Sequence, residues 1–499
     1  MIPRSEHTPS IAPARGPRES IFELGAPESA CVLGPVLDVP VIDLHEALSG
    51  MDRTALPRLP HVAEVEIMRH YAHLAEMNFG VDSGPYPLGS CTMKYNPRAN
   101  EDAARLEGFT GLHPYQPIAS VQGVLELLVC LQEAFGEISG LPAVSLQPSA
   151  GAHGELAALM CFRAAHTANG HPRTTVLIPD TAHGTNPATV SMCGYKTVTI
   201  PSGVHGIVDL DALRDALDPS VAAFMLTNPN TLGLFEPQIA EITQMVHSAG
   251  AFAYCDGANL NAIMGVTRPG DQGFDALHIN VHKTFSTPHG GGGPGAGPVC
   301  VTRELARYLP GPLPVRLDDG SYGLVNPEAS IGRVRSFLGN VGVLVRAYTY
   351  VRALGGHGLR EVSEQAVISA NYLKKLLDSV YEAPYDRTCM HEFVLSGSRQ
   401  KRTHGVRTVD IAKRLLDYGF HPPTVYFPLI VEEALMIEPT ETESMAALEA
   451  FAEALIAIDR EAAHDPELVR GAPYTTPVRR VDEARAAREP VLRWFPDEG

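Results

Sequence analysis

The fold is decided by the stretch FAYCDG at residues 252–257, a short apolar run that ends in Asp256 and Gly257. Short apolar runs bounded by turn residues are typical of buried strands, so this run predicts a strand with an acid at its carboxyl end. Helical patterns such as Pro237–Ala249 lie between further runs of this kind. Those runs lie at residues 174–178, 222–226 and 299–301. The alternation predicts a mostly parallel sheet covered by helices.

A lysine ends the next apolar stretch, HINVHK at residues 278–283, and follows Asp256 by 283 − 256 = 27 residues. A lysine amine can form a Schiff base with an aldehyde, and an aspartate can hold a protonated ring nitrogen. Pyridoxal 5'-phosphate needs both groups, and the predicted strand ends bring them to one edge of the sheet. Alone, Lys283 would be read as an ordinary lysine and Asp256 as a turn residue. As a pair, they predict a pyridoxal phosphate enzyme.

Two further stretches follow predicted strands. The first, SAGAHGE at residues 149–155, opens a predicted helix with small residues. Backbone N–H groups at such a helix start can hold a phosphate, although a plain strand-to-helix turn is equally consistent with the pattern. The second, DTAHGTNP at residues 180–187, contains His183, whose imidazole can stack on a planar ring. A lone histidine is more often structural, so this interpretation depends on its neighbours.

The glycine run HGGGGPG at residues 289–295 is open to several interpretations. It contains a GxGxxG pattern, but a proline interrupts the helix that a dinucleotide site needs. It also matches the HGGG loop of esterases, yet the chain has no GxSxG nucleophile motif. A flexible linker would bring serines with the glycines. We favour a loop whose backbone approaches a cofactor or a partner chain closely.

Composition excludes several classes of protein. The net charge of −18 argues against binding to nucleic acid, and no apolar stretch is long enough to predict a membrane span. The start of the chain lacks the apolar core of a secretory signal. The eight cysteines are scattered without a CxxC pair, which favours free thiols, no metal site and a cytoplasmic location.

The chain length predicts two or three domains. Residues 1–60 are rich in proline and predict an extended N-terminal arm. Residues 61–345 predict a large α/β domain, which begins with a helix near residues 62–77 and a Gly- and Pro-rich loop at residues 80–91. Residues 346–499 predict a smaller α+β domain with a late helix near residues 445–458.

Taken together, these motifs resemble the P-protein of the glycine cleavage system, in its two-subunit form and as the second subunit. The resemblance extends over about residues 60–480 and rests on long, uncommon stretches. They are YPLGSCTMKYNP at 86–97, QPSAGAHGE at 147–155, AHGTNPA at 182–188, TNPNTLG at 227–233, YCDGANLN at 254–261, RPGD at 268–271, HKTFSTPHGGGGPG at 282–295 and PPTVYFP at 422–428.

The resemblance implies a fold-type I pyridoxal phosphate enzyme, a glycine dehydrogenase (aminomethyl-transferring, decarboxylating). Lys283 would form the Schiff base, Asp256 would hold the pyridine nitrogen and His183 would stack on the ring. Eight residues are expected to bind the cofactor: Ala150, Gly151, Ala152, Thr185, Asn186, Asn230, Ala258 and His282. Four residues of the stretch at 86–96, which overlaps the loop at 80–91, are expected to bind substrate: Ser90, Cys91, Thr92 and Asn96.

The resemblance also implies a reaction and its partners. Glycine would lose its carboxylate as carbon dioxide, and its aminomethyl group would pass to the lipoyl disulfide of the H-protein. A homologous subunit 1 would complete an α2β2 assembly. Two alternatives remain open: another fold-type I amino-acid decarboxylase that releases a free amine, and a non-catalytic scaffold subunit that has kept the fold.

Overall fold

The computed structural model describes residues 20–24, 36–53, 59–113 and 115–493. Internal contacts divide them into a unit of residues 81–470 and a second unit of residues up to 80 together with those from 471 onward. The second unit contains the helices α1 (Leu44–Ala47), α2 (Glu64–Glu76) and α15 (Glu483–Arg488). Helix α2 confirms the helix predicted near residues 62–77. The predicted arm at 1–60 includes residues 1–19, 25–35 and 54–58, which lie outside the described residues.

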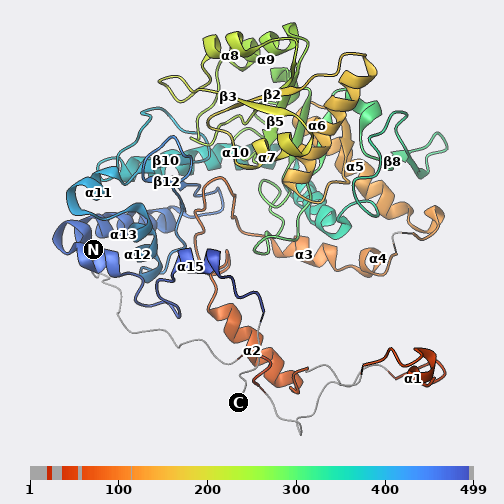
Figure 1. The fold of residues 1–499 in the computed structure, drawn as a ribbon, viewed down its shortest axis with the longest axis horizontal. Coiled ribbons are helices and arrows are strands. Elements are labelled where there is room, and N and C mark those ends of the chain that lie inside the picture. Colours follow the sequence, from red (N-terminus) through yellow and green to blue (C-terminus); the bar gives the residue numbers. More distant parts are fainter. Residues whose placement is uncertain (1–19, 25–35, 54–58, 114, 494–499) are drawn as a thin grey trace. The chain divides into compact units, whose positions relative to one another are not determined.

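A seven-stranded sheet forms the centre of the larger unit, with the strand order β1-β7-β6-β5-β4-β2-β3. Figure 1 labels its strands β2, β3 and β5. Only β7 runs against its neighbours among these strands, so the predicted, mostly parallel sheet is confirmed. The strands are β1 (Ala143–Ser145), β2 (Thr175–Pro179), β3 (Lys196–Ile200), β4 (Val221–Leu226), β5 (Phe252–Gly257), β6 (Ala276–Ile279) and β7 (Val299–Val301). Asp256 therefore lies at the carboxyl end of a central strand, as predicted.

Helices cover both faces of this sheet, because side chains of the buried strands alternate between two apolar cores. Leu177 on β2 packs into the core that contains α5, α9 and the first part of α10. Its neighbours Val176 and Ile178 point to the opposite core, which contains α6 and α7. The helices are α5 (Gln122–Ser139), α6 (Gly151–Ala168), α7 (Thr185–Met192), α8 (Leu210–Ala216), α9 (Ile239–Ser248) and α10 (Val341–Leu377).

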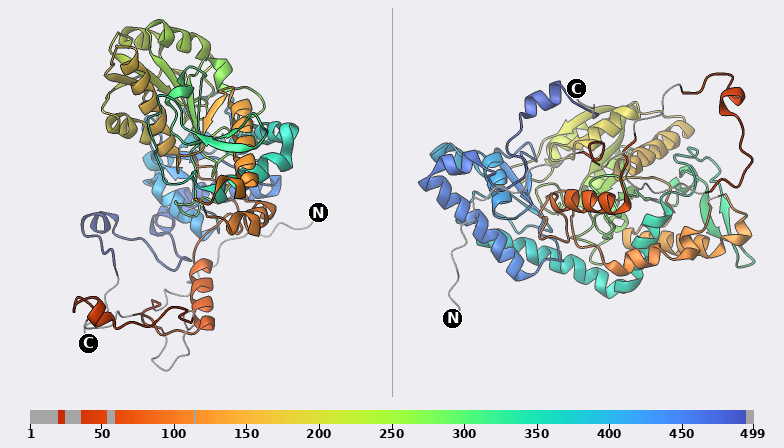
Figure 2. Two further views of the ribbon diagram at one scale, coloured as in Figure 1. Left: turned by 90° about the vertical axis from the view of Figure 1, so that its right-hand side faces the viewer. Right: turned by 90° about the horizontal axis from the view of Figure 1, so that it is seen from below.

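A second, antiparallel sheet has the order β10-β12-β11 and shares its own apolar core with helices α12 and α13, while α11 packs against α13. Figure 2 shows this part of the chain in blue. The elements are β10 (Phe393–Ser396), β11 (Thr424–Val425), β12 (Ala434–Ile437), α11 (Ser398–His404), α12 (Thr408–Asp417) and α13 (Met445–His464). Helix α13 confirms the predicted late helix. Helix α10 reaches from the first core to this one and bends at Gly355, whose φ is 61°.

Shorter elements complete the chain. They are the helices α3 (Arg98–Ala104), α4 (Glu107–Thr110) and α14 (Pro466–Gly471), the hairpin β8 (Leu313–Arg316) and β9 (Tyr322–Val325), and three single turns of 3₁₀ helix at Ile118–Ser120, Pro269–Gln272 and Leu305–Tyr308. Among the described residues, no helix is both long and apolar enough to cross a membrane.

Candidate active site

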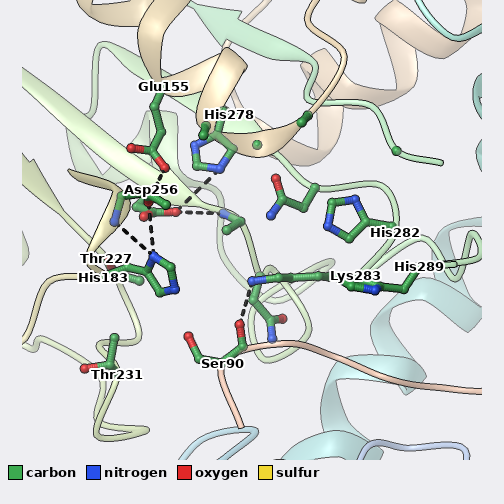
Figure 3. A pocket seen from close by; sticks show the side chains of 18 of the residues that line it. Ser90, Glu155, His183, Thr227, Thr231, Asp256, His278, His282, Lys283 and His289 are labelled. Carbon is green, nitrogen blue, oxygen red and sulfur yellow. Dashed lines mark hydrogen bonds and ion pairs between the residues drawn. The ribbon is translucent and has the colours of Figure 1, made fainter. Parts of the chain in front are cut away.

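A cavity of about 290 Å³ lies at the carboxyl ends of the central strands, where an open α/β sheet binds its ligands. In Figure 3, Asp256 and His183 lie on one side of this cavity, His282 and His289 lie on the other, and Lys283 lies between them. Its volume is at the lower end of the range of small-molecule sites. Ten predicted site residues line it: Ser90, Ala150, Gly151, Ala152, His183, Thr185, Asp256, Ala258, His282 and Lys283.

Lys283 lies in the turn that follows β6, just beyond the strand end where the sequence predicted it. Its side chain is only 9% exposed. Its Nζ atom donates a hydrogen bond to the backbone oxygen of Ser90 over 2.6 Å (Figure 3). Ser90 has a φ of 63°, in the left-handed region that non-glycine residues rarely adopt. The Gly- and Pro-rich loop therefore supplies a fixed acceptor for the lysine.

Asp256 is held as a carboxylate by its neighbours. Its Oδ2 atom accepts a hydrogen bond from the Asn186 amide over 3.0 Å, and its Oδ1 atom accepts one from the N–H of Ala258 over 3.1 Å. Burial opposes ionisation, but nearby His278 and these two hydrogen bonds hold the pKa of Asp256 below its ordinary value. A buried anion at this position suits a positively charged ring nitrogen.

Glu155 is a second buried carboxyl group behind Asp256. It accepts hydrogen bonds from Thr185, Asn186 and Thr189 over 2.7, 3.0 and 3.1 Å. The Asn186 amide thus bridges the two acids. Burial and the charge of Asp256 raise the pKa of Glu155 to about 7. The sequence prediction included this residue only as the end of a phosphate-binding stretch, because nothing in a linear pattern places it beside Asp256.

The ring of His183 is fixed from both sides. Its Nδ1 atom lies 3.1 Å from the Thr185 hydroxyl and accepts the Thr185 N–H over 3.3 Å. The ring of Phe427 meets it edge-on, with the ring centroids 5.9 Å apart. Burial, followed by the charge of Lys283, lowers the pKa of His183, so its imidazole is neutral at pH 7. A neutral, fixed ring on the cavity wall can pack against a planar ligand.

The start of α6 also opens on the cavity, and its glycine allows a close approach of backbone. A Cβ atom on Gly151 would lie 2.0 Å from Oδ1 of Asn280, and one on Gly297 would lie 1.9 Å from the oxygen of Ala150. Helix α6 has 18 residues, and its N-cap residue, Ala150, makes no side-chain capping bond. Its first N–H groups are therefore available to an anion.

Five side chains that line the cavity have buried polar atoms without a hydrogen-bond partner among the described residues. These atoms are Thr227 Oγ1, His278 Nε2, Asn280 Oδ1, His282 Nδ1 and both ring nitrogens of His391. Buried polar groups are nearly always hydrogen-bonded, and such atoms around one cavity point to a polar ligand. Burial and the charge of Lys283 lower the pKa of His282 to about 3, so this ring is neutral.

Comparisons with known proteins show the family of the chain. The family model described as "Glycine cleavage system P-protein" matches residues 96–319, and "Glycine dehydrogenase, C-terminal domain" matches residues 362–470. A probable glycine dehydrogenase (decarboxylating) subunit 2 from Desulforamulus reducens is 56% identical over 96% of this chain and 99% of its own length. The corresponding protein of Oceanobacillus iheyensis is 56% identical over 93% of this chain and 96% of its own.

The chain belongs to the glycine dehydrogenase (decarboxylating) subunit 2 family. The family that the sequence motifs indicated is therefore confirmed.

Solved structures show the same fold at lower identity. A glycine decarboxylase (P-protein) of the glycine cleavage system, in inhibitor-bound form, has a TM-score of 0.71 at 22% identity. The match covers 83% of this chain and 95% of that one. The cysteine desulfurase CsdA of Escherichia coli has a TM-score of 0.57 at 15% identity, over 76% of this chain and 95% of that one. The predicted fold-type I architecture is confirmed.

Five predicted site residues of this family member do not line the cavity. Asn186 lies behind Asp256, and the Asn230 side chain closes its own turn through the N–H groups of Leu232 and Leu234. The other three belong to the stretch at 86–96 and are Cys91, Thr92 and Asn96. Thr92 donates to Glu438, and Asn96 donates to the backbone oxygen of Ser286 over 3.0 Å. Burial raises the pKa of Cys91, which keeps it a thiol.

The cavity has further lining residues that were not among the individual residues predicted to be catalytic, cofactor-binding or substrate-binding. They are Glu155, Thr227, Pro229, Thr231, Asn259, His278, Asn280, His289, Gly292, Gly293, Pro294, Gly295, His391 and Glu392. Many lie within or beside the motifs quoted above, and could have been found from their position after a predicted strand. His391 and Glu392 come from another sheet, more than 100 residues after Lys283, and no local pattern links them to it.

Proposed function

We propose that this chain decarboxylates glycine with pyridoxal 5'-phosphate and passes the aminomethyl group to the lipoyl arm of the H-protein. The single observation that carries the proposal is the meeting of Lys283 and Asp256 in one small cavity. Relatives at 56% identity over nearly the whole chain are named probable glycine dehydrogenase (decarboxylating) subunit 2. The free thiols of the described cysteines support a cytoplasmic location for the reaction.

The residues around the cavity fit this cofactor. Lys283 supplies the amine for its aldehyde, and ionised Asp256 supplies a partner for the ring nitrogen. Neutral His183 supplies a face for the ring, and the start of α6 at Ala150, Gly151 and Ala152 supplies N–H groups for the phosphate. When bound, the cofactor supplies an electron sink for the electrons that carbon dioxide leaves behind.

The chain's own residues then bind and orient the substrate. The cavity volume of about 290 Å³ leaves little room beside a cofactor, which favours an amino acid without a side chain. The backbone of Ser90 holds Lys283, so the loop fixes the amine near the reacting atoms. In the transfer, the lipoyl disulfide is opened and reduced: one sulfur bonds to the aminomethyl carbon, and the other becomes a thiol.

We also propose that the chain works with a homologous subunit 1 in an α2β2 assembly. The names of its relatives, which specify a subunit 2, support this partnership. The extended arm predicted over residues 1–60 is the kind of segment that such an interface uses. The proposed division into a large domain of residues 61–345 and a small one of residues 346–499 is consistent with the separate apolar cores of the two sheets.

The test is the release of carbon dioxide from carboxyl-labelled glycine, with subunit 1 and lipoylated H-protein each added or withheld. We expect full release only when both are present. Release of a free amine without H-protein would contradict the proposal and favour a plain decarboxylase. The chain loaded with the cofactor should show a visible absorbance band that is absent in Lys283→Ala. The lack of such a band in the unaltered chain would favour a scaffold role.

A further inference from the structure

Two carboxyl groups meet in the wall of the cavity, beside a histidine. His391 and Glu392 immediately precede β10, and Glu438 immediately follows β12. Because Phe393 pairs with Ile437 in this antiparallel sheet, Glu392 and Glu438 are the next opposite pair. One polar atom from each of the three residues lies within 4.8 Å of the others. Their side chains are buried, at 2, 3 and 0% exposure for His391, Glu392 and Glu438.

Several polar atoms of this cluster have no hydrogen-bond partner among the residues that the structure describes, and Nε2 of His391 lies 3.7 Å from Oε1 of Glu392. Glu392 accepts the N–H of Ser90 over 2.7 Å, and Glu438 accepts the Thr92 hydroxyl and the Asn259 amide through its Oε1 atom. The other oxygen of Glu438 and both ring nitrogens of His391 have no hydrogen-bond partner within the described part of the chain. A buried carboxylate oxygen with no donor is costly, whereas a protonated oxygen brings its own donor.

The charges around the cluster leave the two acids short of cations. The positive charge of Lys283 favours the ionised form of both Glu392 and Glu438. Its Nζ atom also donates to the backbone oxygen of Ser90, and the N–H of Ser90 donates to Glu392. The Cys91 thiol and the carboxylate of Glu441 also face the cluster. The other buried lysine nearby, Lys94, is 2.7 Å from Glu441 and is used by that pair. One ammonium therefore faces two carboxyl groups.

Two buried carboxylates this close cannot both be ionised, as in the paired acids of other enzymes. Burial and the neighbouring Glu438 raise the pKa of Glu392 well above its ordinary value. Burial raises the pKa of Glu438 to about 7. Burial and the charge of Lys283 lower the pKa of His391 to about 3, so its ring stays neutral and adds no cation. Both pKa values are raised, so at least one of the two carboxyl groups keeps its proton at pH 7.

We propose that Glu392 and Glu438 share one proton and form the acid–base pair of the cavity, with Glu392 as the member that exchanges protons with the substrate amine. Glu392 lines the cavity and Glu438 does not, so Glu438 is a positioning residue that acts through Glu392. The proposal rests on the proposed function, because that function defines the amine that enters.

The proton step balances without any other reagent. Free glycine carries an ammonium group, which must lose a proton before its nitrogen can attack a carbonyl carbon. One N–H bond breaks, its electron pair stays on nitrogen, and an O–H bond forms on the ionised carboxylate. The pair then holds two protons until one is returned to an amine or thiolate that leaves the site. Nothing is oxidised or reduced.

Infrared spectroscopy tests the shared proton on the full chain freed of cofactor, without any need for activity. We expect a protonated-carboxyl stretch at pH 7 that loses one component in the Glu392→Gln and Glu438→Gln variants, whereas the component from Glu155 remains in both. Glu433→Gln is the matched control, because Glu433 is also a buried acid beside β12, with Lys401 at 2.9 Å. Burial opposes its ionisation, but hydrogen bonds from Thr408 and Lys401 hold its pKa below the ordinary value. This control should keep the band.

Two results would overturn the proposal. The first is a difference spectrum in which neither glutamine variant loses a protonated-carboxyl band. The second is a stoichiometric divalent cation in the purified chain that both variants lose, because one imidazole and two carboxylates are also metal ligands. The infrared and metal measurements decide the matter even if the glycine reaction itself fails, so the failures of the two proposals are distinguishable.

A pH profile separates a positioning role of Glu438 from a structural one. With subunit 1 and H-protein present, kcat/KM for glycine should fall on the acid side as the pair fills with protons. Glu438→Gln removes the repulsion that favours protonation of Glu392, so the acid limb should move down by about one pH unit or more. Glu433→Gln should leave the limb in place. A limb that is identical in all three proteins contradicts the assignment.

Discussion

The side-chain amide of Asn186 lies between two buried carboxyl groups and donates a hydrogen bond to each. Its Nδ2 atom donates to Glu155 and to Asp256 over 3.0 Å each. Without this donor, the two carboxyl groups would face each other across the space behind the cavity, and Asp256 would lose one of the contacts that keep it ionised. The amide therefore maintains the charge on which the ring nitrogen would depend.

We expect Asn186→Ala to weaken the binding of pyridoxal phosphate by about tenfold, because an unpaired buried polar group costs about 1–3 kcal/mol. The pKa of Asp256 should rise in this variant. Equilibrium titration of the chain with the cofactor, followed by absorbance, measures the affinity. Asn169→Ala at the exposed end of α6 is the control and should bind normally. Equal affinities in all three proteins would show that Asn186 has no such role.

Glu155 should make stability depend on pH. Folding raises its pKa from an ordinary value of 4.5 to about 7, so the folded chain binds this proton more tightly than the unfolded chain. The contribution of this proton to the free energy of unfolding is therefore complete below about pH 4.5 and is lost as the pH rises through about 7.

The measurement is urea unfolding of the cofactor-free chain across this pH range. Between pH 4.5 and pH 7 or above, the free energy of unfolding of the wild type should fall by up to about 3 kcal/mol more than that of Glu155→Gln. Parallel curves for the two proteins would mean that the pKa of Glu155 is not raised by folding.

At the residue scale, the sequence predicted those site residues that directly follow a recognisable apolar strand. Lys283, Asp256 and His183 each follow an apolar run, and such positions converge at one edge of a parallel sheet. The acid cluster of Glu392 and Glu438 could not be found, because it depends on the register of a sheet far along the chain. Asn186 was expected at the cofactor, yet it bonds the acids behind it, a distinction that only side-chain directions make.

At the scale of elements, the start of α6 is placed by glycines that allow backbone contact. Gly151 leaves room for Asn280, and Gly154 lies against the backbone oxygen of Gly297 and the side chain of His278. The sequence predicted a helix opened by small residues, and α6 confirms it. The same stretch would have suited an ordinary tight turn, so the pattern alone left the phosphate role undecided.

We expect Gly151→Ala to weaken the binding of inorganic phosphate and of the cofactor, because the new Cβ would lie 2.0 Å from Asn280 Oδ1 and would displace the helix start. Overpacking of this kind typically also costs about 1–3 kcal/mol of stability. Gly123→Ala in the first turn of α5 is the control, since its Cβ would meet nothing within 4 Å. Calorimetric titration measures both affinities, and unchanged values in Gly151→Ala would contradict the phosphate role of α6.

A buried ion pair joins α12 to α13. Arg414 is 2% exposed and donates to both oxygens of Glu461, over 2.8 and 2.9 Å. Glu461→Gln removes one of two carboxylates that pair with Arg414 and leaves the other, Asp417 at 3.0 Å, so it should lower the free energy of unfolding by about 1–3 kcal/mol. Cofactor affinity should not change, because neither residue lines the cavity. Urea unfolding with a cofactor titration checks both, and unaltered stability would refute the role of this pair.

At the scale of the whole molecule, alternating strands and helices were enough to predict the central sheet and the late helix. The reversed strand β7 was not foreseen, because VCV at residues 299–301 has the same apolar pattern as the parallel strands. The arrangement that matters for function joins two sheets, since the cavity takes Lys283 from one and Glu392 from the other. A sequence therefore predicts which residues are reactive more readily than it predicts which distant segments form the wall around them.

The most direct test of the account is to map the lysine that the cofactor labels. The chain, loaded with pyridoxal phosphate, is reduced with borohydride to fix the lysine–aldehyde linkage, digested and analysed by mass spectrometry. The account predicts one labelled peptide, containing Lys283. Lys94 is the internal control, because it is also buried but is saturated by Glu441, Asn261 and Tyr350. A label on Lys94 or on any other lysine, with Lys283 unmodified, would contradict it.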